Sequence, residues 1–89
     1  MSVAANYNKE SKPLNITGKT FCQTIGITYN GQILQSLREL NLVSFFKVGK
    51  KYMYPVEETT IISDKLRNGE ISIKTNDGYY ITLNEKKII

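Results

Sequence analysis

Histidine is absent from the 89-residue chain, and cysteine occurs once, as Cys22. A single thiol cannot form a disulfide within the chain, and it lacks the partners of a zinc site. Without histidine, the chain also lacks the commonest general base near neutral pH and the usual serine and cysteine triads. The eight acidic residues are scattered. The sequence therefore predicts a protein that is not an enzyme, needs no metal or other cofactor, and has no small-molecule substrate.

Long hydrophobic runs are also missing. Apolar pairs such as Leu42-Val43 and Ile61-Ile62 are far shorter than the roughly 20 residues of a membrane span. The first six residues have no charged region followed by an apolar stretch, as a secretory signal would. We therefore expect a cytoplasmic protein that does not bind membranes. A chain of this length buries only roughly 60–65% of its unfolded surface, so one small core is expected.

The charge that is present is positive. The net charge is +4 and the pI is about 9.2, which is compatible with a nucleic-acid partner but does not identify one. Placement is more informative than the total, because Lys47, Lys50 and Lys51 lie close together with no acid among them. Such a run is either a solvated turn or part of a binding surface.

The N-terminal part of the chain predicts a flexible arm followed by a short helix. Residues 1–13 lack apolar periodicity and end in Pro13. A helix over residues 18–25 can be capped by Thr17 and terminated by Gly26, since glycine adopts a left-handed conformation without strain.

A second helix is predicted to begin after Thr28 or Asn30, either of which can cap it, and to run to about Leu40. Asn41 then suits a left-handed terminator. The apolar positions of this helix fall on one stripe at three- and four-residue spacing: Ile33, Leu34, Leu37 and Leu40. Two short helices joined by a tight turn form a helix-turn-helix pattern.

The next segment predicts a β-hairpin with strands at 45–48 and 51–54 around Gly49-Lys50. Pro55 suits the first turn of a third helix, with acids near its positive end. We expect its buried face to consist of Ile61, Ile62 and Leu66, and Asn68-Gly69 to end it. The aromatic residues of the hairpin (Phe45, Phe46, Tyr52 and Tyr54) are expected mostly in the core or in strand pairing.

A second hairpin is predicted at residues 71–83, because Asn76-Asp77-Gly78 is a strong turn signal between two β-prone segments. It can pair with a partner chain, extend the sheet or cover the core. Tyr79 and Tyr80 point to opposite faces of a strand, so at least one of them is expected to be exposed.

The resulting order is helix, helix, hairpin, helix, hairpin, which predicts a small α+β winged helix-turn-helix. Residues 14–67 resemble the excisionase-type helix-turn-helix domains related to the mercury-resistance regulators. The resemblance lies in the turn at 25–28 (IGIT) and in the wing and proline at 46–55 (FKVGKKYMYP). The chain departs from that pattern in about two extra residues before Gly49, in Asn41 where glycine is usual, and in the second hairpin.

This organisation gives three regions. Residues 1–13 form the arm, residues 14–67 form the winged helix-turn-helix domain, and residues 68–89 form a hairpin and tail packed on the same domain.

Reading DNA requires side chains that reach base edges from a helix in the major groove. Amides of asparagine and glutamine can pair with adenine, and arginine can pair with guanine. Arg38 can also bridge to Glu39 or to a phosphate. The outward positions of the second helix that suit base reading are Thr28, Tyr29, Asn30, Gln32, Gln35 and Arg38.

DNA binding also requires cations that contact phosphates. Lys50 and Lys51 lie at the predicted hairpin tip, with Lys47 and Tyr52 as supports, and Lys19 lies near a helix N-terminus that favours anions. The plainer alternatives remain open. Tyr29 and Asn30 can serve only as caps, the glutamines can be ordinary surface residues, and the lysines can simply keep a turn soluble.

The sequence thus predicts a sequence-specific binder of double-stranded DNA, either a small transcription regulator or an excisionase-like protein of a phage or mobile element. With four to five phosphate contacts a single copy binds weakly, so a homodimer or a cooperative oligomer on DNA is expected. The alternative is a protein-interaction module that uses the 71–83 hairpin to dimerise or to bind a partner protein.

Overall fold

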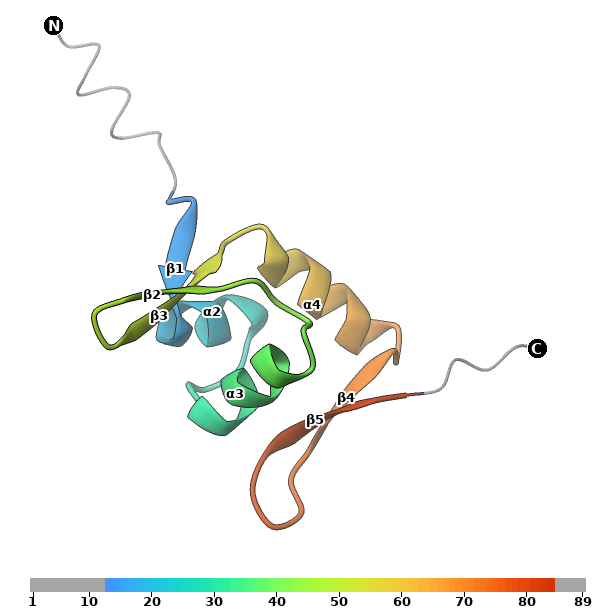
Figure 1. The fold of residues 1–89 in the computed structure, drawn as a ribbon. Coiled ribbons are helices and arrows are strands. Elements are labelled where there is room, and N and C mark those ends of the chain that lie inside the picture. The colour runs from blue at the N-terminus through green and yellow to red at the C-terminus, as the bar shows by residue number, and fades with distance from the viewer. Residues whose placement is uncertain (1–12, 85–89) are drawn as a thin grey trace, which may run out of the picture.

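The computed structural model describes residues 13–84, and these form a small α+β domain. They contain three helices, a three-stranded antiparallel sheet and a C-terminal β-hairpin (Figure 1). The predicted tail after residue 84, and the predicted arm except for Pro13, lie outside the described residues. The elements in chain order are β1 (Asn15–Thr17), α2 (Gly18–Ile25), α3 (Gly31–Glu39), β2 (Phe46–Val48), β3 (Lys51–Pro55), α4 (Glu58–Arg67), β4 (Ile71–Lys74) and β5 (Tyr80–Leu83).

The predicted limits of the first helix are confirmed. The Thr17 side chain accepts a hydrogen bond from the N–H of Thr20, which satisfies one of the free donors at the start of α2. Gly26 ends the helix in the left-handed region, at φ 94°. Both signals are local, so they could be recognised without knowing the fold.

For the second helix, the structure decides between the two candidate caps. Asn30 Oδ1 accepts the N–H groups of Gln32 and Ile33 at 2.9 and 3.0 Å, so Asn30, and not Thr28, caps α3. Asn41 has φ 59°, as expected for a left-handed terminator.

Strand β1 was not predicted. It pairs with β3, with Ile16 opposite Tyr54, so the sheet order is β1-β3-β2. The predicted wing hairpin is formed by β2 and β3, and Lys47 lies opposite Tyr52. β1 is three residues long and has one buried side chain, which is too short for a recognisable hydrophobic alternation. This strand exists because a distant segment pairs with it.

The prediction that Pro55 begins the third helix is wrong. Pro55 is the last residue of β3 and lies opposite Asn15. Pairing of β3 with β2 ends at Met53, so Pro55 has a strand neighbour on one side only. A proline, which cannot donate a ladder hydrogen bond, is tolerated where one side of a strand is unpaired.

The third helix, α4, has a different buried face from the predicted one. Ile62 is 1% exposed and Leu66 is half-buried, but Ile61 is 48% exposed. Adjacent residues of a helix point about 100° apart, so Ile61 and Ile62 cannot both face the core. Thr59, three residues before Ile62, is buried instead. Asn68 ends α4, and Gly69 follows at φ 80°, as expected.

The core lies where the helices meet the three-stranded sheet and the second hairpin. Tyr54 is fully buried, and its ring lies 5.3 Å from that of Phe21 of α2. Of the aromatic residues predicted for the first hairpin, Tyr54 is therefore in the core, whereas Phe45 and Phe46 are nearly half exposed. The buried hydrophobic residues are Ile16, Phe21, Cys22, Ile33, Leu34, Leu37, Val43, Tyr54, Ile62, Ile71 and Ile81.

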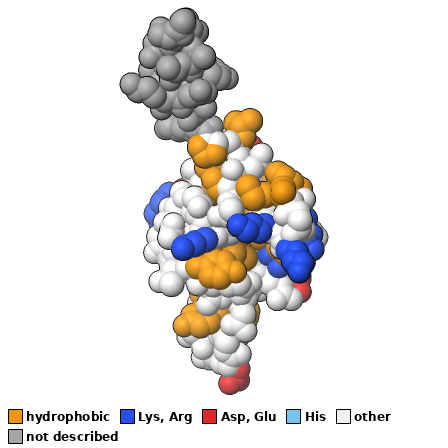
Figure 2. All heavy atoms as spheres, turned by 90° about the vertical axis from the view of Figure 1, so that its left-hand side faces the viewer, with side chains coloured by type: hydrophobic (Ala, Val, Ile, Leu, Met, Phe, Trp, Pro, Cys, Tyr) orange, Lys and Arg blue, Asp and Glu red, His pale blue; other side chains and the backbone are white. Residues whose placement is uncertain are grey.

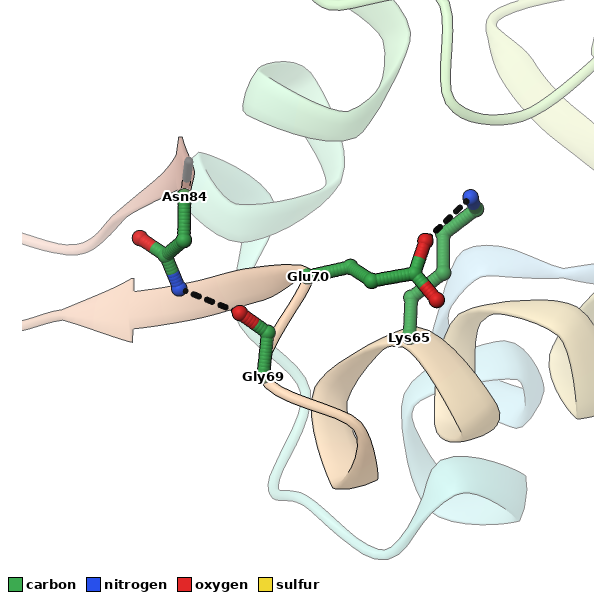
Figure 3. A network of polar contacts seen from close by, with 4 residues as sticks. All are labelled: Lys65, Gly69, Glu70 and Asn84. Atoms are coloured by element: carbon green, nitrogen blue, oxygen red, sulfur yellow. Dashed lines mark hydrogen bonds and ion pairs between the residues drawn. The ribbon is translucent and has the colours of Figure 1, made fainter. Parts of the chain in front are cut away.

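The C-terminal hairpin packs beside α3, on the side opposite the β2–β3 hairpin (Figure 1). The base of this hairpin is fixed by polar contacts at the C-terminal end of α4 (Figure 3). Asn84 Nδ2 donates to the carbonyl oxygen of Gly69 at 2.9 Å, and Lys65 Nζ bridges to Glu70 Oε1 at 3.3 Å. Both Tyr79 and Tyr80 are exposed. Of the three roles left open for this hairpin, the described structure shows that it covers the core.

The neighbours Ile61 and Ile62 provide a matched test of the packing of α4. We predict that Ile62→Val lowers the free energy of unfolding by about 1 kcal/mol, because it removes a buried methyl group. Ile61→Val should change it by less than about 0.5 kcal/mol, since that side chain is half exposed. Urea unfolding of both variants measures the difference. Equal losses would show that the two side chains are buried alike.

Candidate functional site

Three segments that are distant in the sequence border one open groove. The N-terminus of α2, the side of α3 and the β2–β3 turn enclose about 530 Å³. None of the residues that line this groove is acidic. They are Thr17, Gly18, Lys19, Tyr29, Gly31, Leu34, Arg38, Lys50, Lys51, Tyr52 and Tyr54. We call this surface the basic groove.

The four cations of the basic groove (Lys19, Arg38, Lys50 and Lys51) are not neutralised by nearby carboxylates. Within residues 13–84, both ion pairs lie in or just after α4, between Lys65 and Glu70 and between Arg67 and Asp64. Figure 2 shows the face that carries the β2–β3 turn, where Lys and Arg side chains spread across the middle with hydrophobic side chains among them. The four groove cations therefore form no ion pair within the described residues.

Arg38 is held by aromatic side chains. Its Nη1 donates to Tyr54 Oη at 2.6 Å, and its Cζ lies 3.8 Å from the ring centroid of Tyr52 and 5.9 Å from that of Phe45. A guanidinium stacked on an aromatic ring is attracted by the electron-rich face of that ring. The contact with Tyr52 thus ties α3 to β3 beside the turn that carries Lys50.

Tyr54 supports this arrangement from inside the core. Burial raises the pKa of its phenol above the ordinary value of 10.0, and the hydrogen bond from Arg38 opposes part of that rise. The phenol therefore stays protonated at neutral pH. It accepts the guanidinium N–H as a neutral group and does not cancel the charge of Arg38.

The structure brings six of the eleven predicted site residues to the basic groove: Lys19, Tyr29, Arg38, Lys50, Lys51 and Tyr52. Lys47 lies outside the groove lining, with its Nζ 5.2 Å from the ring centroid of Tyr52. Thr28 lies instead at a smaller hollow beside the C-terminal hairpin.

The remaining polar residues of the second helix are engaged within the protein. Asn30 caps α3 through Oδ1. Gln32 Oε1 accepts the N–H of Tyr79 at 3.1 Å, and Gln35 Nε2 donates to Glu39 Oε2 at 2.9 Å on the exposed side. Both glutamines are exposed, but Gln32 holds the C-terminal hairpin, whereas the side chain of Gln35 bonds to Glu39 of its own helix.

Two further residues shape this region in ways that were not identified from the sequence, where Ser36 was expected only to face outward. Ser36 Oγ accepts the N–H of Ile81 at 3.0 Å, so Ser36 and Gln32 together hold β5. A Cβ atom on Gly18 would lie 2.6 Å from Leu34 Cδ1, so the absence of a side chain lets α2 approach α3 at the groove. A glycine directly after a helix cap was the available signal for this close approach.

Within residues 13–84, no three potential metal-ligating side chains gather in one place, and no helix has the length and apolar character of a membrane span. Burial raises the pKa of the single thiol, Cys22. Its thiolate is therefore disfavoured, and Cys22 acts as a small core residue.

No protein-family model matches the chain, and comparisons with curated proteins and with solved structures give no significant match.

The two contacts that hold β5 against α3 predict a measurable effect on hydrogen exchange. Gln32→Ala removes the acceptor of the Tyr79 N–H, and Ser36→Ala removes the acceptor of the Ile81 N–H. In each variant we expect the amide that has lost its acceptor to exchange roughly threefold to tenfold faster. Amide exchange followed by NMR measures this. Gln35→Ala is the matched control, because Gln35 contacts Glu39 and not the hairpin. Unchanged protection in the first two variants would contradict the anchoring role.

Proposed function

We propose that this protein binds double-stranded DNA as a winged helix-turn-helix, with α3 at the major groove and the β2–β3 turn against the backbone. The observation that carries the proposal is the basic groove, where four cations from three segments converge with no acidic residue among them. A duplex carries one negative charge per roughly 1.7 Å of its axis, so a surface of uncompensated cations suits it as a partner.

The order of elements supports the same reading. Helices α2 and α3 are joined by a tight turn at Gly26, and the β2–β3 hairpin follows them directly. In a helix-turn-helix, the second helix enters the major groove through its N-terminal residues. Here the N-terminal end of α3 and the lysine-bearing turn border the same groove, so one duplex can contact both.

The outward surface of α3 suggests which side chains read bases. The exposed positions of α3 are Gly31, Gln32, Gln35 and Glu39, and Tyr29 is exposed just before the helix. We assign base contacts to Tyr29 and Gln35, because both side chains are exposed and an amide can pair with adenine. Gln35 would exchange its exposed bond to Glu39 for a base, whereas Gln32 holds the C-terminal hairpin. The acid Glu39 lies at the C-terminal end, away from the end that enters the groove.

The alternative function, a protein-interaction module built on residues 71–83, has less support. The edge of β5 that faces α3 has its Tyr79 and Ile81 N–H groups bonded to Gln32 and Ser36. Strand addition on that edge would have to break both contacts. We propose a regulator or excisionase-like DNA-binding role in preference.

The lysines of the wing provide the test. We predict that Lys50→Glu with Lys51→Glu weakens binding to a duplex at least about tenfold, and changes the slope of log affinity against log salt from roughly −4 to roughly −2. Fluorescence anisotropy over a range of salt concentrations measures both quantities. Lys74→Glu is the charge control, compared with Lys50→Glu alone, because Lys74 is exposed on the other hairpin and does not line the basic groove. Binding that is absent, insensitive to salt, or equally affected by the Lys74 change contradicts the proposal.

A further inference from the structure

The manner in which Arg38 is held indicates a specific task for it. In the described residues its guanidinium contacts one phenol oxygen and two aromatic ring faces, and it forms no ion pair with a carboxylate. An arginine this close to the core usually has its charge balanced by an acid. Here a neutral phenol and two ring faces fix the group and leave its full positive charge in place.

The geometry also leaves hydrogen-bond donors available. A guanidinium has five N–H donors, and the contact with Tyr52 is made to a ring face 3.8 Å from Cζ, which accepts no conventional hydrogen bond from it. Tyr54 Oη accepts a hydrogen bond from Nη1, and it is the one acceptor that the described residues supply to the guanidinium of Arg38. Since Arg38 lines the basic groove, the remaining donors have a route to a ligand there.

We propose that Arg38 seats one phosphate group of the DNA backbone in the basic groove, and that Tyr54 and Tyr52 are positioning residues for it. This inference rests on the proposed function and chooses among the roles that the sequence left open for Arg38, which were base reading, a bridge to Glu39 and a phosphate contact. The planar fork of a guanidinium matches two phosphate oxygens at once.

The neighbours of Arg38 suit the same ligand. Lys19 and Gly18 lie in the first turn of α2, whose N–H groups and positive end favour an anion, and they line the same groove. Lys50 and Lys51 line it from the wing. The phosphate would therefore lie in a groove lined by cations from three segments, with Arg38 as the fixed member and the lysines as flexible ones.

Fixing the guanidinium in advance has an energetic consequence. An arginine side chain that is free in solution loses rotamer freedom when it binds a ligand, and this loss opposes binding. Because Tyr52 and Tyr54 already hold Arg38, much of that loss occurs on folding and not on binding. Removing the phenol oxygen should thus weaken binding although the charge remains.

Three variants separate charge, geometry and positioning. Arg38→Lys keeps the charge but loses the bidentate contact with two phosphate oxygens. We expect it to bind a duplex roughly tenfold more weakly, with an unchanged slope of log affinity against log salt. Arg38→Gln should weaken binding further and reduce the magnitude of the salt slope by about 1. Tyr54→Phe keeps the charge, and we expect a loss of roughly threefold to tenfold with an unchanged slope. Thermal unfolding of each free variant checks that it is folded at the assay temperature.

Replacing the phosphates of the duplex one at a time identifies the phosphate that Arg38 contacts. In a set of duplexes, each with one phosphodiester replaced by a neutral methylphosphonate, one position should weaken binding of the original protein roughly tenfold. The same replacement should have little effect on Arg38→Gln, because the partner has already been removed. If no position couples to Arg38, or if Arg38→Lys alters the preference between two duplex sequences, Arg38 does not seat a phosphate and the inference is overturned.

An inorganic phosphate titration distinguishes failure of this inference from failure of the proposed function. If the original protein binds no duplex, the proposed DNA binding is wrong. NMR shifts of the Arg38 and Lys19 resonances on adding inorganic phosphate would then show that this site binds free phosphate compounds instead. If those shifts are absent as well, Arg38 does not bind phosphate and the inference is overturned. If the protein binds duplexes but all three variants bind equally well, DNA binding stands and the role of Arg38 is wrong.

Discussion

The buried phenol of Tyr54 is the contact on which the rest of the structure depends. Its strand pairs with β1 through Ile16, its ring packs on Phe21 of α2, and its oxygen accepts the hydrogen bond from Arg38 of α3. One fully buried side chain thus joins the sheet, helices α2 and α3 and the lining of the basic groove. The position of the β2–β3 hairpin relative to α3 follows from this contact, and so does the convergence of their positive charges.

Helix α3 is occupied on three sides, which limits what it can do. Its apolar stripe faces the core, Arg38 faces the wing, and Gln32 and Ser36 hold the C-terminal hairpin. The proposed function leaves Gln35 as the amide of α3 for base reading. Specificity from so few side chains is modest, and this agrees with our expectation that tight binding needs two or more copies of the chain on adjacent sites.

The parts of the fold that could be predicted are those with local causes. Thr17 and Gly26 mark the limits of α2, and Asn41 follows α3, through interactions that span a few residues. The missed features have distant causes. Strand β1 needs β3, the exposure of Ile61 depends on which face of α4 meets the core, and the engagement of Gln32 depends on Tyr79, 47 residues later. The basic residues of the candidate site were identifiable from their charge, but their convergence required the fold.

The most direct test of the account is a map of the DNA contact surface by NMR on the isotope-labelled chain, titrated with a duplex at low salt. The account predicts that amide shifts concentrate at residues 17–19, at 29–38 and at 49–52, the three segments that border the basic groove. Shifts that are absent, or that concentrate on α4, which contributes no residue to the groove lining, would contradict it.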